Sequence, residues 1–133
     1  MIHLPIYAAL TAALLMFLQL TLMMLVGFAR IRTTQSIGDG GDPELLMAIR
    51  RHGNLIENAP TFIAILVLLE MLAGTSTLIL TLGLAFLAVR VAHAVGMSMG
   101  IEPNFSRAIG AFGTLALSLG TAGYLTWVVV SFL

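Results

Sequence analysis

The sequence contains no cysteine and no lysine, and charged residues make up only 9% of its 133 positions. Without cysteine the chain forms no disulfide, offers no thiolate nucleophile and builds no cysteine-ligated metal site. Any thiol in its chemistry must therefore belong to a bound molecule. Its six arginines are balanced by six acidic residues, which excludes the basic surface that neutralises nucleic-acid phosphates. Histidines at positions 3, 52 and 93 lack the i,i+4 spacing of a metal pair, so we expect no metal site.

Apolar residues dominate what remains: 59% of the chain is hydrophobic and the mean hydropathy is +1.06. This composition excludes an ordinary soluble domain. About 20 apolar residues cross a bilayer as a helix, and the segments that satisfy this are 4–29, 43–73, 76–99 and 107–132. The first is too long for a signal-peptide core and has no basic leader, so we interpret it as a retained span. The sequence predicts an all-α integral membrane protein, a four-transmembrane-helix bundle forming a single domain over residues 1–133.

The linkers carry turn residues, and the distribution of arginine orients the spans. The segment IGDGGDP ends at Pro43 where a helix would begin, and GTST and EPN separate the later spans. Arginines flank the first linker and one follows the third, whereas GTST and both termini have none. The positive-inside rule therefore predicts cytoplasmic first and third linkers, with the termini on the non-cytoplasmic side. Compactness and short loops fit a bacterial inner membrane.

A polar cluster, RRHGNLIEN at 50–58, stands at the start of the second span. Ionisable side chains inside a membrane are costly, and this indicates a functional site by default. Arg50, Asn54 and Glu57 are spaced i, i+4, i+7, so we expect them to form one stripe that points inward. In the third span Arg90 and His93 share a face in the same way, and depth counting places them in the same layer.

Such a layer suits a small zwitterion with surplus negative charge. Guanidinium groups fork onto carboxylates, and a carboxylate such as Glu57 receives an ammonium group. Glutathione fits this description, and cations near its thiol favour the thiolate. Each of these residues also has a purely structural alternative. Arg50 and Glu57 would form an ion pair that fixes packing, and His93 would bond a neighbouring carbonyl or side chain. The interfacial arginines would only orient the protein in the membrane; these are Arg30, Arg32 and Arg51.

The pattern R-x-H-x-N-x-x-E at 50–57, followed by a proline-containing apolar run, resembles the second-helix signature of the MAPEG family. This family of membrane-associated eicosanoid and glutathione proteins includes microsomal glutathione transferases, leukotriene C synthase and microsomal prostaglandin E synthase. The resemblance covers nearly the whole chain, with GFARIR at 27–32, RVAH at 90–93 and Arg107 at the start of the fourth span.

The resemblance implies a homotrimer that holds glutathione between neighbouring subunits near the cytoplasmic face. Arg107 matches the arginine that would stabilise the glutathione thiolate. By position, the residues that would bind glutathione are Arg30, Arg50, Asn54, Glu57, Arg90 and His93.

The chain departs from the eicosanoid enzymes at several positions. Asn58, Met97 and Ala111 replace their tyrosines, and Gly53 replaces an additional arginine of prostaglandin synthase. These departures argue against prostaglandin or leukotriene synthesis. They favour a glutathione-dependent transferase or peroxidase that acts on small lipophilic electrophiles dissolved in the bilayer. The alternatives are a small channel or transporter, which would need polar groups at the midplane, and a non-catalytic scaffold that retains the fold.

Overall fold

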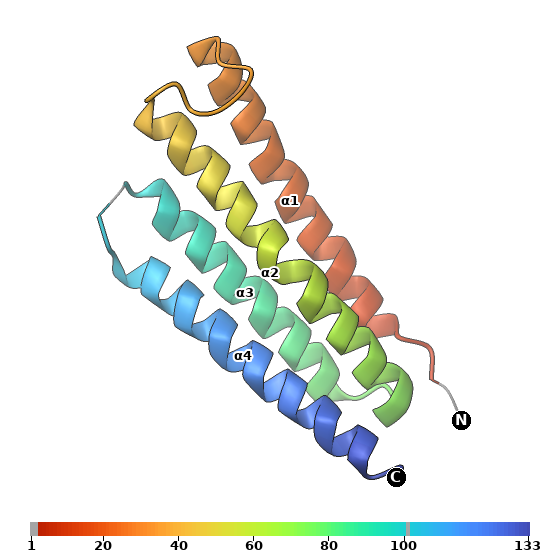
Figure 1. Ribbon diagram of the computed structural model, residues 1–133. Helices are drawn as coiled ribbons and strands as arrows, with labels where there is room; N and C mark the ends of the chain where they lie inside the picture. The colour runs from red at the N-terminus through yellow and green to blue at the C-terminus, as the bar shows by residue number, and fades with distance from the viewer. Residues whose placement is uncertain (1–2, 101) are drawn as a thin grey trace.

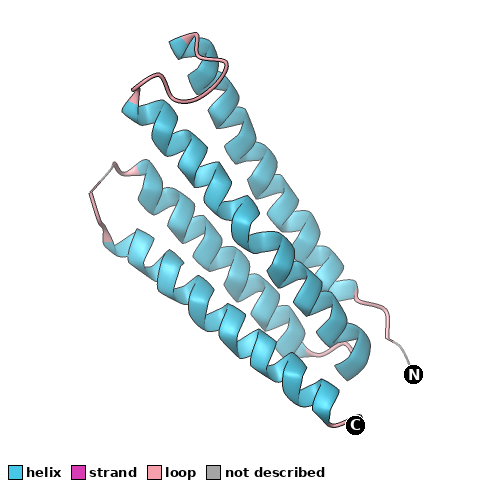
Figure 2. Ribbon diagram, in the orientation of Figure 1, coloured by secondary structure: helices cyan, strands magenta, loops and turns pink. Residues whose placement is uncertain are grey.

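The structure is a computed structural model that describes residues 3–100 and 102–133, and its helices form one elongated antiparallel bundle (Figure 1). The helices are α1 (Ile6–Thr33), α2 (Pro43–Ala73), α3 (Thr77–Ser98) and α4 (Phe105–Val130). Only loops join them in the described part of the chain, which has no strand (Figure 2). All four are long and apolar enough to cross a membrane. The predicted all-α class and the four spans are therefore confirmed.

The helices α2 and α3 form the centre of the bundle. Each of them contacts α1 and α4, whereas α1 and α4 are not neighbours within the described residues. Both termini lie at one end of the bundle, and the loops α1–α2 and α3–α4 lie at the other (Figure 1). We call the latter the linker end. Every arginine of the chain belongs to the half of its helix nearer to this end, as the sequence predicted.

Polar side chains begin three of the helices by the usual capping chemistry. The side chains of Asp42, Ser76 and Asn104 accept hydrogen bonds from the third residue inside α2, α3 and α4, which satisfies amides that have no partner in the first turn. Pro43 follows Asp42 as the first residue of α2, a position where its missing N–H costs nothing.

Helix α1 has no such cap of its own, because Pro5 precedes it. Glu70, in the last turn of α2, replaces the missing cap: its carboxylate accepts from the N–H groups of Tyr7 at 3.1 Å and Ala8 at 2.7 Å. The residue is fully buried. From the sequence one would place Glu70 at the interface as a solvated group. In the structure it joins the start of α1 to the end of α2.

Two helix ends extend beyond the predicted segments, and the other differences are of one or two residues. Helix α1 continues to Thr33, beyond the predicted end at residue 29, because Arg30 stabilises its end. The Arg30 Nη1 donates to the carbonyl oxygens of Gln35 at 3.2 Å and Gly38 at 3.1 Å. Helix α4 begins at Phe105 rather than 107, where the Asn104 cap places it.

Candidate functional site

Arg90 is the most deeply buried cation of the bundle and joins three helices near the linker end. Its side chain is on α3 and the residue is only 2% exposed. The Nη1 group donates to Thr114 Oγ1 of α4 at 3.0 Å, and the Nη2 group donates to Asn54 Oδ1 of α2. The predicted meeting of Asn54 with Arg90 is therefore observed.

The partners of Arg90 are neutral oxygens. Within residues 3–100 and 102–133 no carboxylate pairs with it, and its buried Nε has no hydrogen-bond partner. A buried charge is costly unless it is paired, and two neutral acceptors compensate it only in part. The site thus holds a preformed cation with unused capacity to bind an anion.

His93 lies one turn further along α3 and packs against α4. The residue is buried. A β-carbon on Gly110 of α4 would lie 2.5 Å from the Cα of His93, far closer than two such atoms approach, so only glycine permits this helix contact. The imidazole lies beside the backbone of Arg107 on α4, so these two residues of the predicted site are neighbours.

Arg107 occupies the first turn of α4, held against the end of α3. Its backbone N–H donates to Asn104 Oδ1 at 3.0 Å, and the same Asn104 side chain donates through Nδ2 to the carbonyl of Gly96 at 2.7 Å. Gly96 is buried beside Arg107, where a β-carbon would meet the arginine Cγ at 2.8 Å. The residue predicted to stabilise a thiolate is thereby fixed near His93, although its own side chain is only half-buried.

Arg50 and Glu57 are exposed on the outside of the single chain. They form no ion pair with each other in the part of the chain that the structure describes. Of the expected inward stripe on α2, only Asn54 reaches the interior, because residues 51, 55 and 58 lie nearer to the bundle axis than 50 and 57 do. The structure thus divides the predicted site: Asn54, Arg90 and His93 lie inside, while Arg50 and Glu57 face outward.

Glu57 lines a cavity of about 280 Å³ between α2 and α4, together with Asn58, Thr61, Phe62, Ile65 and Ser118. This groove is polar and opens on the outer surface of the bundle. Arg30 lies elsewhere, with its guanidinium on the carbonyls of the first linker. The predicted residues therefore do not line one pocket within a single subunit.

Sequence reasoning missed Thr114 and Asn104, which position Arg90 and Arg107. Thr114 is buried, and its hydroxyl donates to Gly110 O at 2.7 Å while accepting from Arg90. The sequence did contain a pattern that could have identified Thr114, because it lies two helical turns after Arg107 on the same face of the helix. Small residues on α4 allow close packing at only some positions: Gly113 packs against Val89, whereas Gly120 and Gly123 have open space beside them.

Comparisons with known proteins show which sequences the chain resembles. The sequence model of the MAPEG family matches residues 8–127. The inner membrane protein YecN of Escherichia coli K12 is 35% identical over 91 residues, which cover 68% of this chain and 66% of the relative. The YecN protein of the E. coli strain O6:H1 matches equally. The matched region thus spans just under two thirds of these relatives' length, and no solved structure matches the chain significantly.

Proposed function

The chain belongs to the MAPEG family, and we propose that it is a glutathione-dependent transferase or peroxidase that acts on lipophilic electrophiles in the membrane. The observation that carries this proposal is the buried Arg90, held by Asn54 and Thr114 without a carboxylate partner in the described chain. An uncompensated guanidinium at the linker end of a cysteine-free protein suits an anionic ligand that brings its own thiol.

Glutathione carries two carboxylates, an ammonium group and a thiol, and the proposed site offers a partner for each. Arg50 and Arg90 would receive the carboxylates as charge-assisted hydrogen bonds. Glu57 would receive the ammonium group, and Asn54 and His93 would orient the peptide. Arg30 would close the site from the end of α1.

We propose that a homotrimer completes this site. Arg50 and Glu57 are exposed on α2, a helix that spans the membrane. An ionised side chain that faces hydrocarbon costs about 3 kcal/mol by insertion scales, and simulations give larger values. A protein surface is therefore a better neighbour for these side chains than lipid. A second copy seated on this face would bring the outward residues together with a neighbour's helix, and glutathione would lie between the two subunits.

Arg107 would act on the thiol. A guanidinium near the sulfur lowers the thiol pKa by stabilising the thiolate, and each pKa unit corresponds to about 1.4 kcal/mol. In conjugation the thiolate sulfur forms a bond to the electrophilic carbon, and the leaving group departs with the electron pair. In peroxide reduction the thiolate attacks the peroxide oxygen, and the alkoxide leaves and takes up a proton.

The experiment is a thiolate difference spectrum near 240 nm on adding glutathione to the purified protein, together with calorimetric binding. We expect binding and a thiolate band at neutral pH, and an Arg107→Ala variant that binds glutathione but loses the band. The matched control is Arg32→Ala, since Arg32 pairs only with Asp42 and Glu44 among described residues, at 3.0 and 3.1 Å. Absence of glutathione binding in both detergent and lipid would falsify the proposal.

One observation favours a second candidate, a non-catalytic membrane scaffold. Met97, which stands where related eicosanoid enzymes carry a tyrosine, is buried in the bundle, and Ala111 is exposed, so neither position supplies a phenol to a thiol. Glutathione binding without turnover of any standard electrophile would support the scaffold. A channel is disfavoured, because the arginines gather toward one end and Glu70 is occupied by the amides of α1.

We further propose that the protein lies in a bacterial inner membrane with its linker end in the cytoplasm. The support is the concentration of arginine at that end and the similarity to an inner membrane protein. A reporter fused to the C-terminus tests the orientation. Activity of a periplasmic reporter is expected, and a C-terminus in the cytoplasm would contradict the orientation.

A further inference from the structure

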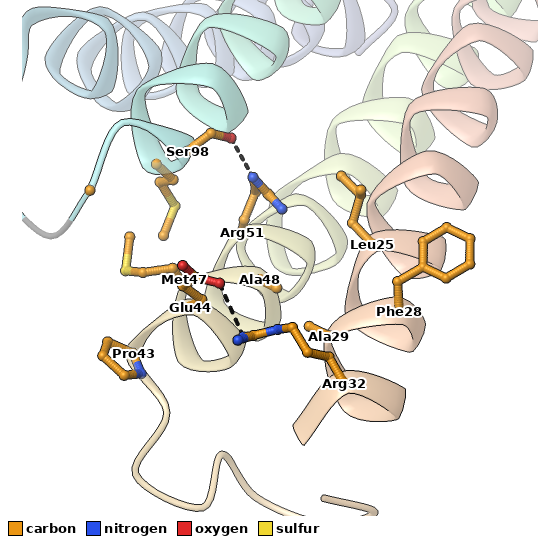
Figure 3. A pocket seen from close by; sticks show the side chains of 12 residues that line it. Leu25, Phe28, Ala29, Arg32, Pro43, Glu44, Met47, Ala48, Arg51 and Ser98 are labelled. Atoms are coloured by element: carbon orange, nitrogen blue, oxygen red, sulfur yellow. Dashed lines mark hydrogen bonds and ion pairs between the residues drawn. The ribbon is translucent and has the colours of Figure 1, made fainter. Parts of the chain in front are cut away.

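A second cavity, separate from the proposed glutathione residues, lies inside the linker end of the bundle. Its volume is about 480 Å³, and α1, α2 and α3 all contribute to its wall (Figure 3). The wall is mainly apolar, formed by Leu25, Phe28, Ala29, Met47, Ala48 and Met97. This volume falls in the range of small-molecule sites, which are typically about 300–1,000 Å³. Methionine side chains in such a wall adapt to chains of varied shape.

Arg51 places a cation on this apolar wall. Its Nη1 donates to Ser98 Oγ on α3, and its buried Nε has no hydrogen-bond partner among the described residues. No carboxylate pairs with Arg51 in the described chain. The carboxylate that shares the cavity, Glu44, is already paired with Arg32 at 3.1 Å, and Figure 3 draws this pair and the Arg51–Ser98 pair as two separate interactions.

We propose that this cavity binds a single-chain amphiphile with a carboxylate head, of the fatty-acid type. Arg51 and Ser98 would hold the carboxylate, because a guanidinium presents two parallel donors to it and the hydroxyl adds a third. The hydrocarbon chain would lie against Leu25, Met47 and Met97. The site does not depend on glutathione binding, since Arg51 projects from a different face of α2 than Arg50 does.

The chemistry of the cavity selects this class of ligand. The apolar wall shields a hydrocarbon chain from water, which favours a ligand with a lipophilic chain. Arg51 has no carboxylate partner in the described chain. It therefore favours a ligand whose head group carries one negative charge over a neutral one, and disfavours a positively charged one. The cavity lies where α1 ends and α2 begins, close to the ends of the predicted spans, and an amphiphile in a membrane places its head group near such helix ends.

The test uses the full-length protein in nanodiscs and a fluorescent polyene fatty acid, with the signal of empty nanodiscs subtracted. Dodecanoate should displace the probe, whereas dodecanol and dodecyltrimethylammonium should displace it at least about tenfold less well. Arg51→Met should weaken probe binding at least about tenfold, the loss expected when a hydrogen-bonded charge pair is removed. Arg50→Met removes the same charge one residue away and should leave probe binding unchanged.

A second variant keeps Arg51 and fills the space instead. Ala29 lines the cavity and is half-buried, so Ala29→Leu should weaken probe binding without removing any charge. Arg51→Met should still bind glutathione as the unmodified protein does, which separates this site from the proposed function. The proposal is overturned if Arg51→Met and Arg50→Met bind the probe equally, if dodecanol competes as well as dodecanoate, or if Ala29→Leu leaves binding intact.

Discussion

At the scale of single residues, two guanidinium groups at the linker end bond neutral side-chain oxygens and no carboxylate within the described chain. Arg90 bonds Thr114 and Asn54, and Arg51 bonds Ser98. Each keeps a buried Nε without a hydrogen-bond partner in residues 3–100 and 102–133. Neutral acceptors orient a guanidinium but leave its charge uncompensated, so both groups remain able to receive an anion. The remaining arginines at this end include Arg30 and Arg32, which already bond carbonyls or carboxylates.

Thr114→Val tests whether Thr114 positions Arg90. The substitution keeps the shape of the side chain but removes the acceptor at 3.0 Å from Arg90 Nη1. We expect a loss of about 1–3 kcal/mol in unfolding free energy, because a buried donor loses its partner, and a raised dissociation constant for glutathione. Calorimetry and thermal unfolding in detergent measure the two effects.

The matched control for this prediction is Thr126→Val on the same helix. Thr126 is exposed, and among the described residues its hydroxyl bonds only the Ala122 carbonyl of its own helix, at 2.9 Å. It should change neither stability nor glutathione binding appreciably. Equal effects of the two substitutions would show that Thr114 has no particular role toward Arg90.

At the scale of helices, the ends decide how the bundle is held together. Asp42, Ser76 and Asn104 cap the helix that each precedes. Glu70 instead caps α1 from α2, so that one carboxylate satisfies a helix terminus and joins two helices that are distant in sequence. Caps of the first kind are local patterns that a sequence can reveal, although the role of Asn104 was missed. A cap across helices requires the fold to be known, so Glu70 could not be recognised from the sequence.

Glu70→Ala should loosen the start of α1. The amides of Tyr7 and Ala8 would lose their acceptor, with a cost of about 1–2 kcal/mol, as for other helix caps. Hydrogen exchange should show faster exchange at these two amides while the middle of α1 stays protected. Glu102→Ala, an exposed residue of the α3–α4 loop, is the control and should leave both amides unchanged. Unaltered exchange in Glu70→Ala would contradict the capping role.

The start of α2 should respond to acid through Asp42. The hydrogen bond from the Leu45 N–H, aided by Arg32, holds the pKa of this carboxyl below its usual value of 3.8, against a smaller opposing effect of desolvation. Because the folded-state pKa is the lower one, the cap stabilises the helix above pH 3.8 and is lost as the pH falls through the lowered value. The NMR shift of the Leu45 amide should titrate with a midpoint below 3.8.

Asp42→Asn provides the comparison for this titration. Asparagine caps helices about as well as aspartate but does not titrate, so the Leu45 amide should show no acid transition in this variant. A transition of the same size in both proteins would assign the effect to another group, such as Glu44 in the first turn of α2.

At the scale of the whole molecule, the sequence was sufficient for the architecture but not for the faces of its helices. Four long apolar segments and the concentration of arginine predicted the spans and the shared end of the bundle, since both follow from the thickness and charge preference of a membrane. The inward stripe on α2 was wrong for Arg50 and Glu57. In a helix that is apolar nearly all round, hydrophobic periodicity cannot tell a buried face from one that lies against lipid or another subunit.

Glu57→Leu distinguishes these two environments for the outer face of α2. If Glu57 faces lipid, leucine removes a charge from hydrocarbon and should stabilise the protein by about 2–3 kcal/mol. If a second copy covers it, as proposed, the substitution removes an interaction between subunits and should shift the protein from trimer toward monomer. Native mass spectrometry in mild detergent measures the distribution of trimer and monomer.

The control is Thr81→Leu on α3, which should leave the trimer intact. Thr81 is exposed, and among the described residues its hydroxyl bonds only its own helix, at 2.8 Å. A monomeric unmodified protein, or a more stable Glu57→Leu protein with unchanged assembly, would place Glu57 against lipid and remove the shared site from the proposal.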